Sequence, residues 1–275
     1  MQSVSLENRL VFEANRAAGH LAFSVAASNG RTSRRDVREQ GPLRVRFPNT
    51  DSDALEAIIV NTAGGIAGGD ALSIDVSVGE NAKLVLGTAA AEKVYRSHGP
   101  DARLALNLEI ASGGQLAWLP QETIMFDRAR LSRRIDVALA SNASAVVVES
   151  IVFGRSAMGE SVAEGLLCDR WRVRLDGQLV FAESTRLSGV VSERLSQPAV
   201  ANGGGAVAMV LIAPGDPERV ERVRGCSGLA GTVGISAWNG IAVARFCATD
   251  GAALRSDLIN VLAALSMPLP RLWLQ

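Results

Sequence analysis

The sequence predicts a mostly-β protein: a stacked β-coil, β-helix-like body followed by a small C-terminal α+β part that carries two helices. Apolar and polar residues alternate with a period of two over residues 72–153, as in half-buried strands. In addition, a strand–turn–strand unit recurs at near-constant spacing, at Lys83, Gln115 and Ser144. One such unit cannot bury its apolar face alone, so the repeat favours stacked coils. A meandering sandwich is the plain alternative.

Each unit contains an alternating strand, a small polar turn and a second, more apolar strand. The turns hold glycine, asparagine and serine, which suit tight backbone turns. Strands are therefore expected across roughly residues 5–200. The alternating strands are predicted at residues 72–78, 104–110 and 135–139, and the more apolar strands at 83–86, 115–119 and 144–151.

The last quarter of the chain changes character after a run of three glycines at residues 203–205, which indicates a joint. We therefore divide the chain into a β-rich, solenoid-like body at residues 1–200 and an α+β module at 201–275. The module is expected to pack on the body, so that the two form one structural unit.

Turn and cap signals predict the elements of this module. Asp216 is a suitable cap for a short helix that begins near Pro217, and the leucine-rich face of the last helix ends before Pro268. Asn239-Gly240 is the strongest short signal for a hairpin. The expected elements are a strand at 207–212, a helix at about 216–226, hairpin strands at 234–238 and 241–246, and a helix at about 251–266.

The composition argues against several classes of function. The 28 basic and 28 acidic residues give a formal net charge of zero, which argues against nucleic-acid binding and against a membrane surface. The three cysteines lie far apart without a CxxC pair, so neither a disulfide framework nor a structural zinc site is indicated. Glu7 and Arg9 stand where a signal peptide needs an apolar stretch, so we expect a soluble, cytoplasmic protein.

A conspicuous segment at residues 61–70 is rich in glycine and ends in Asp70. A phosphate-binding loop would need the GK[ST] pattern and a following helix, but an alternating strand follows here. The favoured interpretation is a tight turn in which Asp70 accepts hydrogen bonds from backbone amides. The glycines of the segment are Gly64, Gly65, Gly68 and Gly69.

Glu149 lies in a run that is apolar on both faces of its strand, so this strand should be covered on both sides. A carboxylate there is costly to bury unless it is paired or faces water inside the protein. Two interpretations stay open: a structural ion pair, for instance with Arg155, or a polar interior such as a cavity, channel or transient metal site. Three more acids have apolar or glycine neighbours and fit an acidic interior: Glu122, Glu160 and Glu183.

Nucleophilic chemistry finds little support in the sequence. With only His20 and His98, a histidine-based triad or a histidine-rich metal site is nearly excluded. A carboxylate-paired, β-helical hydrolase of the glycosidase type is the alternative enzyme hypothesis. Such enzymes generally need aromatic platforms for sugars, and only 4% of the residues are aromatic.

Several ordered motifs resemble the UreD (UreH) family of urease accessory proteins. The most specific are WLPQETI at residues 118–124 and the GRxxxGE pattern at 154–160. Further matches lie at residues 30–48, 64–70, 92–97 and 269–274, so the resemblance covers the whole length. One departure is Thr62-Ala63, which stand where the family usually has Pro-Pro before the first Gly-Gly.

The resemblance implies a mostly-β, helix-poor fold and a role without catalysis. Family members bind apo-urease and, through UreF, recruit the GTPase UreG, so the chain is expected to work within a hetero-oligomer that delivers nickel to urease. The resemblance further implies that no cofactor is permanently bound and that transient Ni²⁺ passes through an internal, water-filled tunnel. The family's path residues match Asp70, Glu149 and Glu183. The motif residues expected to have structural roles are Gly64, Gly65, Gly68, Gly69, Trp118, Gln121, Glu122, Arg155 and Glu160.

The residue types fit a nickel conduit better than a nickel store. Carboxylates and water bind Ni²⁺ more weakly than imidazole or thiolate, so an ion can enter and leave. A plain structural subunit without an ion path is the third hypothesis. Trp273, close to the chain end, is expected either to dock on the body or to contribute to the contact with UreF.

Overall fold

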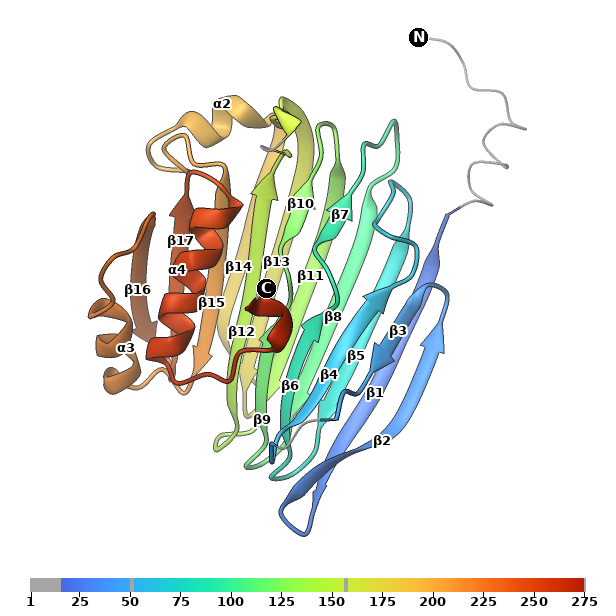
Figure 1. Cartoon of the computed structure of the whole chain (residues 1–275), viewed down its shortest axis with the longest axis vertical. Helices are drawn as coiled ribbons and strands as arrows, with labels where there is room; N and C mark the ends of the chain where they lie inside the picture. Colours follow the sequence, from blue (N-terminus) through green and yellow to red (C-terminus); the bar gives the residue numbers. More distant parts are fainter. Residues whose placement is uncertain (1–15, 50–51, 156–157, 275) are drawn as a thin grey trace.

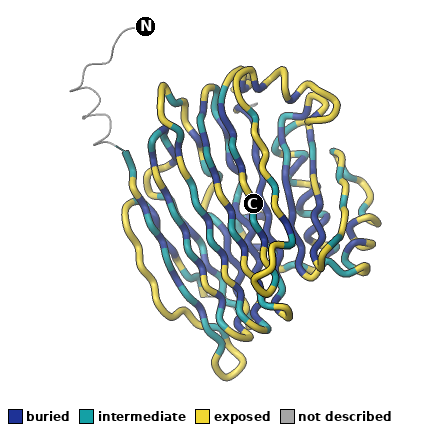
Figure 2. Tube along the Cα trace, turned by 180° about the vertical axis from the view of Figure 1, so that it is seen from behind, coloured by how far each residue is buried: buried dark blue, intermediate teal, exposed yellow. Residues whose placement is uncertain are grey.

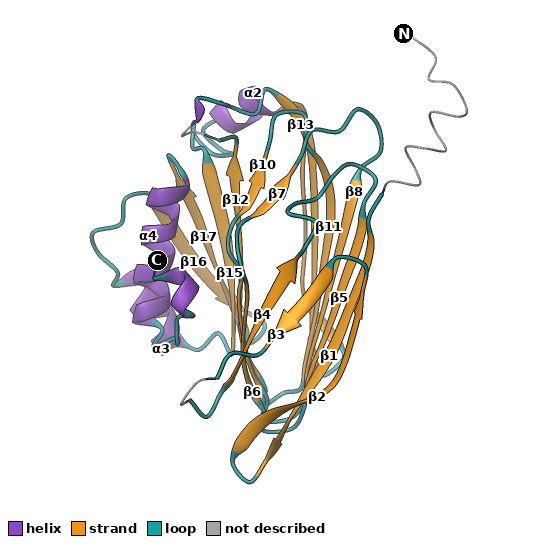
Figure 3. Cartoon of the chain, turned by 45° about the vertical axis from the view of Figure 1, so that its right-hand side comes forward, coloured by secondary structure: helices purple, strands orange, loops and turns teal. Residues whose placement is uncertain are grey.

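The structure of the chain, a computed structural model, describes residues 16–49, 52–155 and 158–274. Two β-sheets face each other, and helices α3 and α4 lie on the outer side of one of them (Figures 1 and 3). This arrangement confirms the mostly-β fold class with stacked coils. The part of the predicted strand region at residues 5–15 lies outside the described residues.

The first sheet, which we call sheet A, has seven described strands in the order β14-β13-β11-β8-β5-β1-β2. Its five inner strands run parallel to one another, and the two edge strands are antiparallel to their neighbours. The strands span Ala18–Ser28 (β1), Arg31–Gln40 (β2), Ala71–Val78 (β5), Ala102–Ile110 (β8), Arg130–Leu139 (β11), Glu164–Leu175 (β13) and Gln178–Val190 (β14).

The second sheet, sheet B, follows the order β16-β17-β15-β12-β9-β6-β4-β3 in the described part of the chain, with the short strands β7 and β10 attached through β12. From β4 to β12 its strands are parallel, and from β12 to β16 they are antiparallel. The strands span Leu43–Arg46 (β3), Leu55–Asn61 (β4), Lys83–Thr88 (β6), Glu92–Val94 (β7), Gln115–Leu119 (β9), Thr123–Met125 (β10), Ser144–Phe153 (β12), Ala206–Ala213 (β15), Thr232–Trp238 (β16) and Ile241–Ala248 (β17).

The three repeats recognised in the sequence occupy equivalent places in sheet B. Lys83 pairs with Gln115, and Gln115 pairs with Ser144, in parallel register. The turns before these strands stack as well, because the backbone amide of Asn81 donates to the carbonyl oxygen of Ser112 at 3.0 Å. Each coil therefore contributes one strand to each sheet, which is the solenoid arrangement that the spacing predicts.

Two apolar cores stabilise the described fold. The larger lies between the sheets and includes the fully buried Leu21, Ile135 and Val147, and Figure 2 shows the buried positions alternating with exposed ones along the strands. The second lies between the outer face of sheet B and the helices and includes Val148 and Leu258. Strand β12 contributes to both cores, so the run around Glu149 is covered on both sides as expected.

The two predicted helices of the C-terminal part are confirmed as α3 (Pro217–Arg224) and α4 (Gly251–Ala264). Asp216 caps α3, since its side chain accepts a hydrogen bond from the Arg219 amide at 2.9 Å. The hairpin of β16 and β17 turns on Asn239-Gly240, as the sequence predicts. No described helix combines the length and the apolar character needed to cross a bilayer.

A further described helix lies before the C-terminal part, so the two helices predicted for that part stand. Helix α2 (Val191–Ser196) falls in a stretch that we predicted as strand. It is six residues long and buries only Val191 and Leu195, which are four positions apart. Over so short a segment, helical and strand periodicities cannot be told apart, so only the tertiary fold decides between them.

The C-terminal segment docks on the body, which is one of the two outcomes expected for Trp273. The short 3₁₀ helix Arg271–Trp273 places this side chain against sheet B, where it is 3% exposed. Its indole N–H donates to the carbonyl oxygen of Leu119 at 2.9 Å. The tail is therefore part of the second core.

The WLPQET motif anchors this tail through Arg255 of α4. The guanidinium of Arg255 donates to the side-chain oxygen of Gln121 at 2.6 Å and forms an ion pair with Glu122 at 3.2 Å. It also donates to the carbonyl oxygen of Leu272 at 2.8 Å. Gln121 and Glu122 thus have structural roles, joining sheet B, helix α4 and the chain end.

We predict that Trp273→Ala lowers the free energy of unfolding by about 3–5 kcal/mol, because it opens a cavity and removes the indole hydrogen bond. Urea denaturation followed by circular dichroism measures the loss. The matched control is Leu274→Ala, since Leu274 is 67% exposed and its truncation should change the stability little. Equal effects of the two substitutions would contradict the docking of the tail.

Candidate functional site

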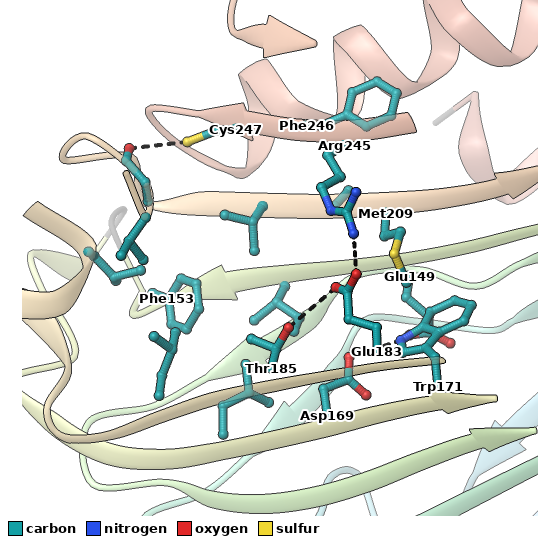
Figure 4. A pocket seen from close by; sticks show the side chains of 18 of the residues that line it. Glu149, Phe153, Asp169, Trp171, Glu183, Thr185, Met209, Arg245, Phe246 and Cys247 are labelled. Atoms are coloured by element: carbon teal, nitrogen blue, oxygen red, sulfur yellow. Dashed lines mark hydrogen bonds and ion pairs between the residues drawn. The ribbon is translucent and has the colours of Figure 1, made fainter. Parts of the chain in front are cut away.

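A cavity of about 400 Å³ lies between the two sheets, bordered by β11, β13 and β14 of sheet A on one side and by β12, β15, β16 and β17 of sheet B on the other. Most of the residues that line it are apolar. Figure 4 shows the view into this cavity, with acidic side chains from both sheets around it. Its charged lining residues are Arg133, Glu149, Asp169, Glu183 and Arg245.

At the inner wall, a buried network of charges joins the two sheets. Arg133 of β11 donates two hydrogen bonds to the carboxylate of Asp169 on β13, at 3.0 and 2.7 Å. The same guanidinium forms an ion pair with Glu149 of β12, across the space between the sheets. Arg133, Glu149 and Asp169 are 2%, 8% and 7% exposed, so the network is shielded from bulk water.

Two tryptophans complete the hydrogen bonding of this network. The indole N–H of Trp118 donates to Glu149 at 2.8 Å, which gives the first residue of the WLPQET motif its structural role. The indole of Trp171 donates to Asp169 at 3.4 Å. When ionised, the two carboxylates exceed the single guanidinium by one negative charge, and the cavity borders this excess.

Burial raises the pKa of Glu149 because desolvation disfavours its ionised form, and the nearby Asp169 adds to this effect. Arg133 and the hydrogen bond from Trp118 act in the opposite direction and do not fully compensate. The carboxyl group therefore holds a proton more readily than an exposed glutamate does.

The sequence had suggested an ion pair for Glu149 but had named the wrong arginine. Arg155 pairs with Glu160 instead, and the true partner is Arg133. Arg133 and Asp169 are not among the candidate site residues that we predict from the sequence, although the strand periodicity points to both. Both are charged residues at inward positions of alternating strands, where their neighbours two residues away are apolar and buried.

Glu183 lies nearer the opening of the cavity. It projects from β14 and forms an ion pair with Arg245 of β17, while the Thr185 hydroxyl donates to it at 3.5 Å (Figure 4). The side chains of Glu183 and Arg245 are 26% and 52% exposed, in contrast to the buried network behind them. The structure thus brings Glu149 and Glu183, two of the three predicted path residues, to one cavity.

Asp70 has a different environment, at the start of β5, and does not line this cavity. One of its carboxylate oxygens accepts from the backbone amide of Ala17 at 2.9 Å, and the other accepts from Ala67 at 2.7 Å. The side chain is 5% exposed. Asp70 therefore closes the glycine-rich turn through backbone amides, and its place on a nickel path stays a prediction.

The glycine-rich segment packs against β7 and needs its glycines for two reasons. Gly64 adopts a φ of +74°, a left-handed conformation that suits glycine, and its carbonyl oxygen accepts from the Tyr95 hydroxyl at 2.9 Å. At Gly68 a side chain would collide with Ser97 and with the backbone of Pro100. The further glycines Gly65 and Gly69 also have positive φ angles.

Thr62 and Ala63 form hydrogen bonds that the prolines of the family pattern could not make, because proline has no N–H. The Thr62 amide and hydroxyl both donate to the carbonyl oxygen of Pro42, each at 2.9 Å. The Ala63 amide donates to the side chain of Asn61 at 3.1 Å. At the entry of the loop, Thr62 and Ala63 therefore provide hydrogen bonds, whereas two prolines would restrict the backbone conformation.

Beneath this loop, Glu92 is a half-buried carboxylate. Desolvation raises its pKa to about 7, although a hydrogen bond from the Asn61 side chain at 3.1 Å acts against this rise. The same amide nitrogen donates to the carbonyl oxygen of Gly65 at 3.1 Å. The glycine-rich loop therefore contacts a group that changes its charge near neutral pH.

The GRxxxGE pattern forms a salt bridge beside the same loop. Arg155 donates to both carboxylate oxygens of Glu160, at 2.7 and 3.2 Å, and this pairing lowers the pKa of Glu160. The guanidinium lies 4.3 Å from the centre of the Phe126 ring, which in turn packs edge-on against Tyr95. Arg155 and Glu160 therefore pair with each other beside the loop region, and neither lines the cavity.

No group of three or more histidine, cysteine, aspartate or glutamate side chains in the described part of the chain is arranged to hold a metal ion. An ion in the cavity would meet single carboxylates, separated along its wall. Such a set of oxygen donors offers weak coordination that water would complete.

Fold and site together define a two-sheet β-solenoid whose interior carries a largely apolar cavity that borders three carboxylates. A family model of the UreD urease accessory protein matches residues 17–274. A "Urease accessory protein UreD" of Rhodopseudomonas palustris (strain BisB5) is 58% identical over 96% of this chain and 94% of its own length. "Urease accessory protein UreD 3" of Bradyrhizobium sp. (strain BTAi1 / ATCC BAA-1182) is 53% identical over 96% of both chains. The chain therefore belongs to the UreD family of urease accessory proteins, as its motifs indicate.

For the buried network, we predict that Arg133→Ala lowers the free energy of unfolding by about 3–5 kcal/mol, because two buried carboxylates lose their shared cation. Chemical denaturation measures this loss. The matched control is Arg134→Ala at the adjacent, exposed position, where an ion pair with Asp136 at 3.2 Å contributes about 1 kcal/mol or less. If the two variants unfold at the same denaturant concentration, the network does not stabilise the fold.

Glu92 gives a prediction about pH. Its folded-state pKa of about 7 exceeds the ordinary value of 4.5, so its contribution to stability is complete below pH 4.5 and is lost as the pH rises through 7. Glu92→Gln should therefore stabilise the protein above pH 7 relative to the wild type and reduce the pH dependence between 4.5 and 7. Thermal melting at a series of pH values measures the difference.

The control for this experiment is Glu160→Gln, because the pKa of Glu160 is lowered by Arg155. Its contribution is present above its ordinary pKa and is lost as the pH falls, so the two substitutions should change the pH profile in opposite directions. A Glu92→Gln profile parallel to that of the wild type would show that burial does not affect this carboxyl group.

Proposed function

We propose that this chain is a non-catalytic scaffold of urease maturation that conveys Ni²⁺ toward the urease active site. Membership of the UreD family supports the role in urease maturation. The observation that carries the conduit is the cavity between the sheets, which has Glu149 and Asp169 at its inner wall and Glu183 nearer the opening. In this proposal Ni²⁺ is cargo and is not a resident cofactor.

In this proposal, electrostatic attraction provides the driving force for the entry of the cation into the cavity. The buried network carries two carboxylates for one guanidinium, and removing a charge from water is costly unless a counter-charge is near. A hydrated divalent cation in the cavity would offset the excess negative charge beside Glu149. Because no dense set of donors surrounds it in the described residues, the ion can leave again.

Glu183 would act as the outer exchange point of this path. Its carboxylate already has a cationic partner in Arg245, and the two side chains come from different sheets. An arriving cation competes with Arg245 for Glu183, so the ion pair would open when Ni²⁺ enters and would close when it leaves. Asp70 belongs to the proposed path on family resemblance alone.

The proposal includes the partners that the family resemblance implies. The scaffold binds apo-urease and, through UreF, recruits the GTPase UreG, and this hetero-oligomer works in the cytoplasm. Family membership at 58% identity to a protein named urease accessory protein UreD supports partnership with the urease maturation machinery. Co-purification of the chain with urease and the other accessory proteins tests the named partners directly.

We predict that Glu183→Gln slows GTP-dependent activation of urease several-fold without preventing complex formation, since it removes the outer carboxylate. The matched variant is Arg245→Gln, which breaks the same ion pair but leaves the carboxylate free. If the ion pair has only a structural role, both variants should slow urease activation equally. If Glu183 carries nickel, Arg245→Gln should retain or increase the rate of urease activation. Nickel content of the urease product and its activity are the two readouts.

Glu149→Gln and Asp70→Asn extend the test along the proposed path. Both residues also have structural hydrogen bonds, so thermal stability and complex formation must be measured on the same preparations. Normal activation by all three carboxylate variants would eliminate the conduit and leave only a scaffold. Calorimetric titration with Ni²⁺ distinguishes a conduit from a plain structural subunit, and turnover on a panel of glycans tests the hydrolase alternative.

A further inference from the structure

Within the described residues no helix packs on the outer face of sheet A, in contrast to the outer face of sheet B. Helices α3 and α4 lie on the side of sheet B, whereas the parallel strands β5, β8, β11 and β13 turn their other face to solvent (Figure 3). Parallel sheets are usually covered on both faces. In solenoid proteins, a broad uncovered face of this kind often binds a partner.

Strand β13 carries a row of arginines on this outer face. Its inward positions are the buried Asp169, Trp171 and Val173, so the alternating positions point outward. These positions are Arg170, Arg172 and Arg174. The flanking strands add Arg134, which is directly opposite Arg170, and Arg186, which is directly opposite Cys168. We call these five arginines the arginine face.

Most of this positive charge has no partner among the residues that the structure describes. Among the described residues, no hydrogen bond or ion pair involves the side chains of Arg170, Arg174 or Arg186. Arg134 has Asp136 at 3.2 Å, and Arg172 donates only to the adjacent backbone carbonyl of Trp171. Like charges directly opposite each other on neighbouring strands, such as Arg134 and Arg170, destabilise a sheet. The isolated chain therefore retains a repulsion that a negatively charged partner would relieve.

A depression of about 390 Å³ adjoins the arginine face and could receive side chains of a partner. Small residues of three neighbouring strands, Ser73, Ala105 and Ser132, line it. Arg103 and Arg170 also line it, and neither side chain has a partner within the described residues. Carboxylates that enter this depression would meet two guanidinium groups, whose planar geometry suits bidentate pairing.

We propose that the arginine face is a docking surface for a carboxylate-rich segment of a partner protein. The protein is neutral overall, so this local excess of positive charge is a feature of one face and not of the whole molecule. Three acids, Asp75, Glu109 and Asp136, lie on the same face over the neighbouring strands. They would repel the continuous phosphate chain of a nucleic acid, whereas a protein can place its own cations over them.

The test measures binding of a fluorescein-labelled oligoglutamate peptide by anisotropy, at low and at high salt. We expect the wild-type chain to bind and the triple variant R170A/R172A/R174A to bind at least about tenfold more weakly, since each removed charge contributes modestly at a surface. The matched control is R31A/R35A/R38A, which removes three exposed arginines from β2 at the far edge of the same sheet. This control should bind the peptide like the wild type, and thermal melting verifies that both variants are folded.

Each other outcome overturns the proposal. No binding by the wild type would show that the arginine face does not bind carboxylate-rich segments. An equal loss in both triple variants would mean that only net charge matters. Tighter binding of a single-stranded oligonucleotide of the same charge would identify the face as a nucleic-acid surface. The arginine face points away from the cavity, so its failure leaves the nickel conduit untouched, and failure of the conduit leaves the arginine face untouched.

Discussion

The buried contact between Arg133, Glu149 and Asp169 is the constraint on which much of the interior depends. It joins β11 and β13 of one sheet to β12 of the other, across a space that is otherwise filled with apolar side chains. Leaving any one of these groups unpaired would be costly, so the relative position of the two sheets is restricted to those that keep all three in contact. The same contact leaves one excess negative charge beside a cavity, which connects stability to the proposed transport of a cation.

The family motifs stabilise different parts of this structure. Trp118 donates to Glu149, and three residues later Gln121 binds the arginine that fixes the chain end. The glycine-rich loop, β7 and the GRxxxGE salt bridge form a separate cluster around Tyr95 and Phe126. A family that conserves these motifs would therefore preserve the structure around the cavity. None of the motif residues would need to contact a transported ion.

The opening of the cavity and the arginine face differ in chemistry and suggest different uses. The opening of the cavity, near Glu183 and Arg245, combines opposite charges that can exchange partners. The arginine face has one predominant sign of charge and is turned away from the cavity. In the proposed function, the cavity would serve the cargo and the arginine face would serve the position of the protein in an assembly.

The strand alternation and the repeat at Lys83, Gln115 and Ser144 were enough to predict the stacked coils, because periodicity and spacing are local properties of the sequence. Cap and turn chemistry likewise predicted α3, α4 and the hairpin at Asn239-Gly240. Helix α2 was missed because six residues carry too little periodicity. The sequence marks Glu149 as an anomalous buried acid, but its partner Arg133 lies on the facing strand of the other sheet, 16 positions away in the chain. Which charges meet, and which of them border a cavity, depends on how the sheets stack, and only the tertiary structure decides that.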